Sequence, residues 1–113
     1  THPLILAKIP VKNPWEIFAY LPFGNWNDCP DTPELMAAAK YWFEQYGAVP
    51  AAMSHDELEF LLPAPVHKEK AMDAAVELYG FCPDVIDQGP EDATVGALAD
   101  VLRRSIVWYL WWD

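Results

Sequence analysis

The last nine residues, 105–113, place the strongest constraint on how this chain can fold. They read Ser-Ile-Val-Trp-Tyr-Leu-Trp-Trp-Asp, so three of the six Trp in the chain fall in one short run. β-Branched and aromatic side chains favour strands, and nothing in the run breaks an extended backbone. Alternation divides it into two sets that face opposite ways, namely Ile106, Trp108, Leu110 and Trp112 against Val107, Tyr109, Trp111 and Asp113. Both sets are largely apolar, so this strand must be covered twice or expose an aromatic face.

Four other segments upstream carry strong local signals. Residues 4–11 are almost continuously apolar and predict a buried first strand. A helix is expected to begin at the Asp31 cap and to end at Gly47, with one apolar stripe along it. Residues 48–53 and 58–62 predict a hairpin, and Pro50 places its first strand at a sheet edge.

Two further helices are expected before the aromatic run. The first spans residues 68–79 and is closed by Gly80, and a long acidic loop follows it over residues 81–92. The second begins at the Thr94 cap and continues through Arg104. A short helix is also expected after residue 13, where Pro14 suits a first turn.

This order of elements predicts an α+β fold. It matches a ferredoxin-like elaboration of the split β-α-β pattern, with a four-stranded, mainly antiparallel sheet and helices on one face. Strand 4–11 and the second hairpin strand would occupy the middle, with the aromatic strand beside strand 4–11 at an edge. Residues 1–113 are expected to form a single globular domain. The open side of such a sheet would expose aromatic side chains.

The charge balance excludes two classes of partner. The chain has 17 acidic and 7 basic residues, a formal charge of −10, so we expect it to bind neither nucleic acid nor an anionic membrane surface. No apolar run is long enough for a membrane span, and no signal peptide is recognised, which predicts a cytoplasmic protein. An acidic surface favours solubility and can steer the domain towards a basic protein.

The tripeptide Cys-Pro-Asp occurs twice, at residues 29–31 and 82–84. Buried small thiols beside ordinary turn residues are the favoured interpretation for Cys29 and Cys82, with a disulfide between them as the next. A metal site that also uses His55 or His67 comes last, because neither cysteine nor histidine pairs have zinc spacing. We therefore expect no metal and no cofactor.

Four blocks of sequence, residues 23–30, 46–48 with 56–59, 81–89 and 108–113, resemble a bacterial family catalogued as domain of unknown function 4253. The resemblance spans the whole chain, except that the connection after Gly89 is longer than in the family pattern. It implies a domain that often lies at the C-terminal end of a longer protein and has no assigned chemistry. The blocks direct attention to a set of candidate binding residues: Trp26, Asn27, Cys29, Cys82, Asp84, Asp87, Gln88, Trp108, Trp111, Trp112 and Asp113.

Two functions follow as hypotheses. The first is a non-enzymatic protein-interaction module, which binds a protein partner or a second copy through the aromatic sheet face and the Trp26 loop. By analogy, an immunity protein that neutralises a basic effector would be of this kind. The alternative is a small-molecule-binding or thiol-dependent catalytic pocket where the Cys29 and Cys82 loops converge, with Asp113 nearby.

Overall fold

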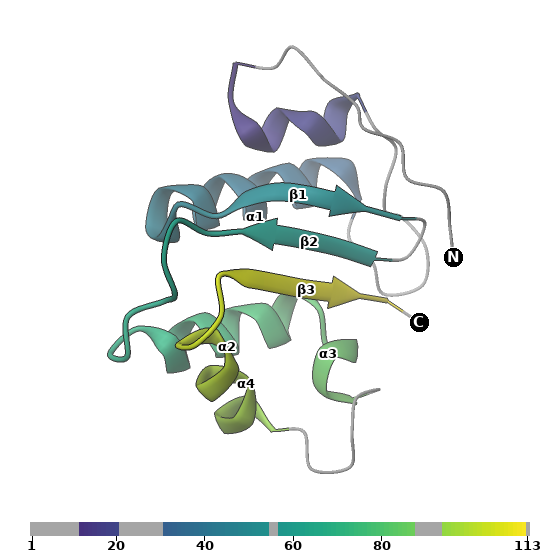
Figure 1. Ribbon diagram of the computed structural model, residues 1–113. Coiled ribbons are helices and arrows are strands. Elements are labelled where there is room, and N and C mark those ends of the chain that lie inside the picture. The colour runs from purple at the N-terminus through teal and green to yellow at the C-terminus, as the bar shows by residue number, and fades with distance from the viewer. Residues whose placement is uncertain (1–11, 21–30, 55–56, 88–93, 113) are drawn as a thin grey trace, which may run out of the picture.

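Helices lie on one side and beyond the edges of a small sheet in the computed structural model, which describes residues 12–20, 31–54, 57–87 and 94–112 (Figure 1). The elements in chain order are the 3-10 helix η1 (Pro14–Ala19), α1 (Thr32–Tyr46), β1 (Val49–Met53), β2 (Glu57–Leu61), α2 (Ala71–Phe81), α3 (Asp84–Asp87), α4 (Val95–Leu102) and β3 (Val107–Trp111). The mixture of helix and strand confirms the predicted α+β class.

The three described strands form one antiparallel sheet in the order β1-β2-β3. The β1–β2 hairpin lies where the sequence predicts it. Within the described sheet β1 is an edge strand, as the proline at position 50 indicates, since proline offers no backbone N–H to a second neighbour. The pairing shifts register between Pro50 and Ala52, so the edge strand is also irregular at this point.

The predicted ferredoxin-like strand order is wrong. In that order strand 4–11 would separate β3 from β2, whereas β3 pairs directly with β2 from Glu57 opposite Trp111 to Leu61 opposite Val107. The ladder continues one step further, because the Leu62 N–H donates to the Ile106 carbonyl at 2.8 Å. A strand has only two edges, and β1 and β3 occupy both edges of β2. Residues 4–11 lie outside the described part of the chain, which contains three strands rather than four.

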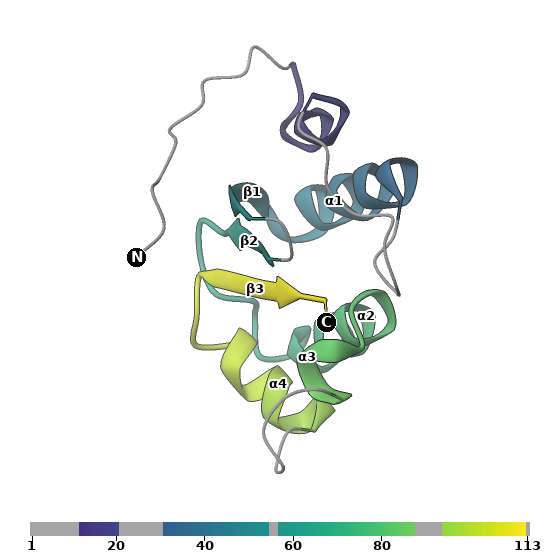
Figure 2. The same ribbon diagram turned by 90° about the vertical axis from the view of Figure 1, so that its right-hand side faces the viewer.

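The long helices gather on one face of the sheet. Figure 2 shows α1 and α2 on the same side of the three strands, with α4 beyond the β3 edge. None of the described helices lies over the opposite face (Figure 2). One side of β2 and β3 is therefore without a helical cover in the described part of the chain.

The hydrophobic core is centred on Trp42 of α1. Its ring makes edge-on contacts with Phe60 of β2, Phe81 of α2 and Trp108 of β3, at centroid distances of 5.5, 5.1 and 5.6 Å. Tilted and edge-to-face pairs of this kind are the geometry that aromatic rings prefer. One side chain therefore connects four elements that lie far apart in the sequence.

Capping residues confirm two of the predicted helix starts and one helix end. An Asp31 carboxylate oxygen accepts the Glu34 N–H at 3.0 Å, and the Thr94 hydroxyl accepts the Ala97 N–H at the same distance. Gly47 ends α1 with a φ of 73°, the left-handed conformation that glycine adopts without strain. These helix ends could be predicted from the sequence because each capping contact joins residues within one helical turn.

Helix α2 differs at both ends from the helix predicted over residues 68–79. It begins at Ala71, and it runs through Gly80 to Phe81 instead of ending at that glycine. The Cys82 N–H donates to the Leu78 carbonyl at 2.7 Å, so the helical hydrogen bonding continues past the glycine. The expected loop after residue 80 also contains the single turn α3.

Candidate functional site

One face of the β2–β3 ladder presents its side chains away from the core. We call this surface the open face and define it as Glu57, Glu59 and Leu61 of β2 with Val107, Tyr109 and Trp111 of β3. These residues pair directly across the two strands. The alternate residues point inward, because successive side chains of a strand face opposite ways. Leu61, Val107 and Tyr109 remain 43%, 41% and 47% exposed.

Hydrogen bonding orders the aromatic centre of the open face. The Tyr109 hydroxyl donates to a carboxylate oxygen of Glu57 at 2.7 Å, diagonally across the ladder. Glu59 lies directly opposite Tyr109. Charge-assisted hydrogen bonds of this length are the stronger kind, so this contact restrains the orientation of the Tyr109 ring.

The open face is acidic as well as apolar. The strands β1, β2 and β3 together contain two Glu and no Lys or Arg. Beside them is a shallow hollow of about 180 Å³, lined by Ala52, Met53, Ser54, Glu57 and Glu59. The two carboxylates, in a chain with a formal charge of −10, make this surface suitable for a cationic group.

A second group of predicted site residues meets at the end of β3. The Cys82 thiol donates to the Trp111 carbonyl at 3.0 Å, and the Phe81 ring contacts the Trp112 ring at 5.9 Å. Asp84, at the start of α3, is also buried. The structure therefore brings the second Cys-Pro-Asp tripeptide to the aromatic C-terminal run.

The three tryptophans of the final run have different environments. Trp108 and Trp112 are each only 1% exposed and belong to the core, whereas Trp111 is partly exposed on the open face. Two of these predicted binding residues are therefore core residues in the described fold. The cause is the alternation along the strand, which directs residues 108, 110 and 112 towards the helices.

Several predicted residues cannot be placed relative to this group. Trp26, Asn27, Cys29, Gln88 and Asp113 lie outside the described residues. Asp87, unlike these five, is described and is the last residue of α3. Their proposed part in a pocket stays a prediction, and so does a contact between Asp113 and the Cys-Pro-Asp loops.

The surroundings of Cys82 are those of a structural thiol. The residue is completely buried, and its Sγ acts as a hydrogen-bond donor to a backbone carbonyl. A nucleophilic cysteine needs solvent access and a stabilised thiolate. Complete burial and a hydrogen bond from Sγ to a backbone carbonyl are typical of a structural thiol.

A hydrogen-bonded cluster that the sequence does not reveal joins α1 to α2. The hydroxyls of Tyr41 and Tyr46 both donate to Oε1 of Glu77, at 3.1 and 3.5 Å. Burial raises the pKa of Tyr46 to about 12, and the negative charge of Glu77 adds to this shift. The hydrogen bond to Glu77 raises the pKa of Tyr41. Because 31 and 36 residues separate the partners, no local pattern could have found this cluster.

Neither a metal centre nor a membrane span is found in the part of the chain that the structure describes. Among residues 12–20, 31–54, 57–87 and 94–112 no group of three or more His, Cys, Asp or Glu could hold a metal ion. No helix within the same ranges is long and apolar enough to cross a bilayer.

The fold and its open face define a small α+β domain with an acidic and aromatic sheet surface. The family described as Domain of unknown function (DUF4253) matches residues 5–113, and the chain belongs to this family. The match confirms the resemblance seen in the four sequence blocks. No curated protein and no solved structure matches the chain.

Proposed function

We propose that this domain is a protein-interaction module whose open face binds a cationic surface of a partner protein. The observation that carries the proposal is the combination of exposed Leu61, Val107 and Tyr109 with two carboxylates on the same face. Tyrosine is enriched among the residues that dominate interface energies, because its ring buries a large area and its hydroxyl satisfies a polar partner.

The order of the open face favours binding. A side chain that is already held in one rotamer loses less entropy when a partner immobilises it, at roughly 0.5–1.5 kcal/mol for each side chain. The hydrogen bond between Tyr109 and Glu57 supplies this restraint in the free domain. Both residues belong to paired strands, which position them more rigidly than a loop would.

Charge decides between a cationic partner and a second copy of the chain. A two-fold dimer through the open face would bring Glu57 and Glu59 of both copies into one interface. Like charges at an interface cost free energy, whereas a basic surface would neutralise both carboxylates. We therefore expect a monomer that binds a basic protein. An effector neutralised by an immunity protein would be one such partner, by analogy alone.

A charge reversal tests the proposal. The immobilised domain is used to capture partners from the source cell, and the captured protein is then titrated against wild-type domain and against Glu59→Lys. We expect a partner with a basic surface and an affinity that falls by about tenfold or more in the variant, because a repulsive pair replaces an attractive one. The affinity of the wild type should also fall as salt is raised.

The matched control is Glu44→Lys, which changes the net charge equally at an exposed position on α1. Its affinity should stay within about twofold of wild type, since rim and remote charges act weakly once salt screens them. Equal weakening by both variants would reduce the interaction to non-specific charge attraction. A partner with an acidic contact surface would also contradict the proposal.

A pocket between the Cys29 and Cys82 loops is the second candidate function. The Cys82 hydrogen bond to the Trp111 carbonyl and the contact of the Phe81 ring with Trp112 motivate it, because they bring the second Cys-Pro-Asp tripeptide to the aromatic C-terminal run. Cys82→Ala separates the two candidates, because that residue lies behind the sheet and not on the open face. Partner binding that survives this substitution in a folded domain belongs to the open face.

A further inference from the structure

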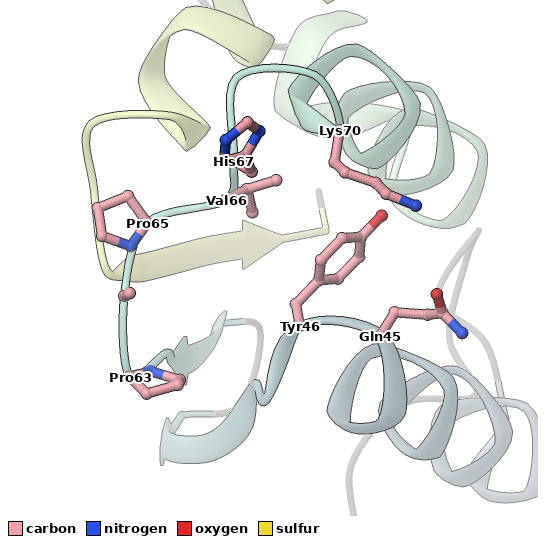
Figure 3. A pocket seen from close by; sticks show the side chains of 8 residues that line it. Gln45, Tyr46, Pro63, Pro65, Val66, His67 and Lys70 are labelled. Carbon is pink, nitrogen blue, oxygen red and sulfur yellow. The ribbon is translucent and has the colours of Figure 1, made fainter.

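We propose that a pocket between the end of α1 and the segment leading into α2 binds a small organic carboxylate with a short apolar body. The pocket has a volume of about 230 Å³, and its lining includes neither a residue of the open face nor Cys82. Figure 3 shows the side chains that line it: Gln45, Tyr46, Pro63, Ala64, Pro65, Val66, His67 and Lys70.

One wall of the pocket is apolar and held in place. Val66 is buried, and its N–H donates to the Leu102 carbonyl of α4 at 3.3 Å. Pro63 packs close to Gly47, where a Cβ would lie only 3.1 Å from the proline ring. Because proline also restricts its own φ, the segment of residues 63–66 forms a wall with little freedom to move.

The opposite wall is the ring of Tyr46. This ring packs against Trp108 at a centroid distance of 5.5 Å, and its hydroxyl donates to Glu77. In Figure 3 the Tyr46 hydroxyl points towards the end of the Lys70 side chain. An aromatic wall that faces a proline-rich wall suits a flat or short apolar group.

The polar groups of the pocket are mainly hydrogen-bond donors. The Glu69 N–H donates to Nδ1 of His67 at 3.3 Å, so Nδ1 acts as the acceptor and the proton of the neutral ring lies on Nε2. Lys70 supplies an ammonium group, and Gln45 supplies an amide. Two donors and an amide around one cavity call for a ligand that accepts hydrogen bonds.

The charge of Lys70 is available to such a ligand. No carboxylate of the described residues forms an ion pair with Lys70, although the chain contains 17 acidic residues. Arg103 and Arg104, by contrast, both pair with Asp100. None of the lining residues is acidic. A carboxylate in the pocket would therefore meet one cation and several donors, although Glu77, which accepts from the Tyr46 hydroxyl, places one carboxylate behind that wall.

Volume limits the ligand to a small molecule. Pockets for drug-sized ligands have about 300–1,000 Å³, so a cavity of about 230 Å³ admits only a small body. The formal charge of −10 also opposes anion binding at long range. We expect a dissociation constant on the order of 1 mM for benzoate, which combines one carboxylate with one flat ring.

Nuclear magnetic resonance titration of the folded domain with benzoate and with benzamide tests the proposal. Benzamide has the same size without the charge. Benzoate should give saturable shifts at the amide groups of Val66, His67 and Lys70, and benzamide should bind about tenfold to a hundredfold more weakly, because it lacks the charge-assisted hydrogen bonds.

Two lysine variants provide the matched control. Lys70→Met keeps an unbranched apolar stem and removes the charge, so benzoate affinity should fall by about tenfold or more. Lys68→Met makes the same change two positions earlier, at an exposed residue that does not line the pocket, and should leave the affinity within about twofold. The proposal is overturned by the absence of saturable shifts up to about 50 mM, well above the expected constant. Equal binding of benzamide, or equal weakening by both lysine variants, overturns it too.

Discussion

Substitution of neighbouring residues on β3 tests which face of the strand carries the stability. Trp108 and Tyr109 are adjacent aromatic residues, but Trp108 is 1% exposed and Tyr109 is 47% exposed. We expect Trp108→Ala to destabilise the domain by about 4 kcal/mol, and Tyr109→Ala by about 1 kcal/mol. The contrast matters because the proposed open face exists only if β3 keeps this orientation.

The larger value follows from the burial of Trp108. A fully buried aromatic side chain removes about 150–250 Å² from water, and at about 25 cal/mol per Å² this contributes about 4–6 kcal/mol. Alanine retains only a small part of that area. Contacts with Trp42 at 5.6 Å and with Tyr46 at 5.5 Å are lost as well. Cores relax around deletions, which brings the expected cost into the range of about 3–5 kcal/mol for Trp or Phe to Ala.

Urea unfolding followed by far-ultraviolet circular dichroism measures both variants without relying on tryptophan fluorescence. With a denaturant slope of about 1.5 kcal/mol per M, the midpoint should fall by about 2–3 M for Trp108→Ala and by less than about 1 M for Tyr109→Ala. Domains of this size have a free energy of unfolding of about 5–15 kcal/mol, so both variants should retain a folded baseline. If Trp108→Ala does not fold, Trp108→Phe against Tyr109→Phe gives the same comparison with smaller losses.

Equal costs at the two positions would refute the assigned orientation. A larger cost at Tyr109 would show that β3 is shifted by one residue, because such a shift moves every side chain to the other face of the sheet. The pairing of β3 with β2 and the definition of the open face would then both be wrong.

Two other predictions concern the hydrogen-bonded cluster and the glycines. The pKa of Tyr46 is raised from 10.0 to about 12, so the stability that its protonated hydroxyl contributes is complete below pH 10 and is lost between pH 10 and 12. In a titration followed by tyrosinate absorbance, wild type minus Tyr46→Phe should therefore show one ionisation step near pH 12. A difference step near pH 10 would contradict this. Gly47→Ala should destabilise by about 1–2 kcal/mol, because its φ is 73° and a Cβ would lie 3.1 Å from Pro63. Gly80→Ala, in helical conformation with nothing within 4 Å, should stabilise by about 0.5–1 kcal/mol, and thermal melts that place both variants on the same side of wild type would refute the contrast.

Features that depend on neighbouring residues could be predicted from the sequence. The Asp31 and Thr94 caps and the Gly47 terminus need only a few adjacent positions, and the apolar stripe of α1 needs only the helical period. The hairpin also lies where turn residues separate two apolar runs. Gly80 shows the limit of this reasoning, because glycine permits a helix end without requiring one.

The strand order could not be predicted in the same way. The side chains of β3 would fit beside either an apolar strand 4–11 or the alternating strand β2, and local sequence does not distinguish the two. The packing of Trp42 against Phe60 and Trp108 brings β2 and β3 to one helix, which is consistent with their direct pairing. Such contacts join residues far apart in the chain and become visible only in the structure.

The candidate sites were predictable to different degrees. Alternation along the final run correctly separated Trp108 and Trp112 from Trp111, but both sets are apolar, so the sequence did not show which set faces the helices. Glu57 became part of the site only through its pairing with β3. The carboxylate pocket escapes sequence reasoning altogether, because residues 45–46 and 63–70 are brought together by the hairpin between them.

Successive side chains of β3 point to opposite faces of the sheet, so its inward and outward residues have different surroundings. Its inward residues attach it to the Trp42 core, and its outward residues form half of the open face. Core attachment fixes the position of the Tyr109 backbone, so the open face depends on Trp108 for its rigidity. A change at Tyr109 can therefore alter binding at little cost to folding, whereas a change at Trp108 must affect both. If partner binding is lost in Tyr109→Ala while the urea midpoint barely moves, the outward residues act in recognition and not in support of the fold.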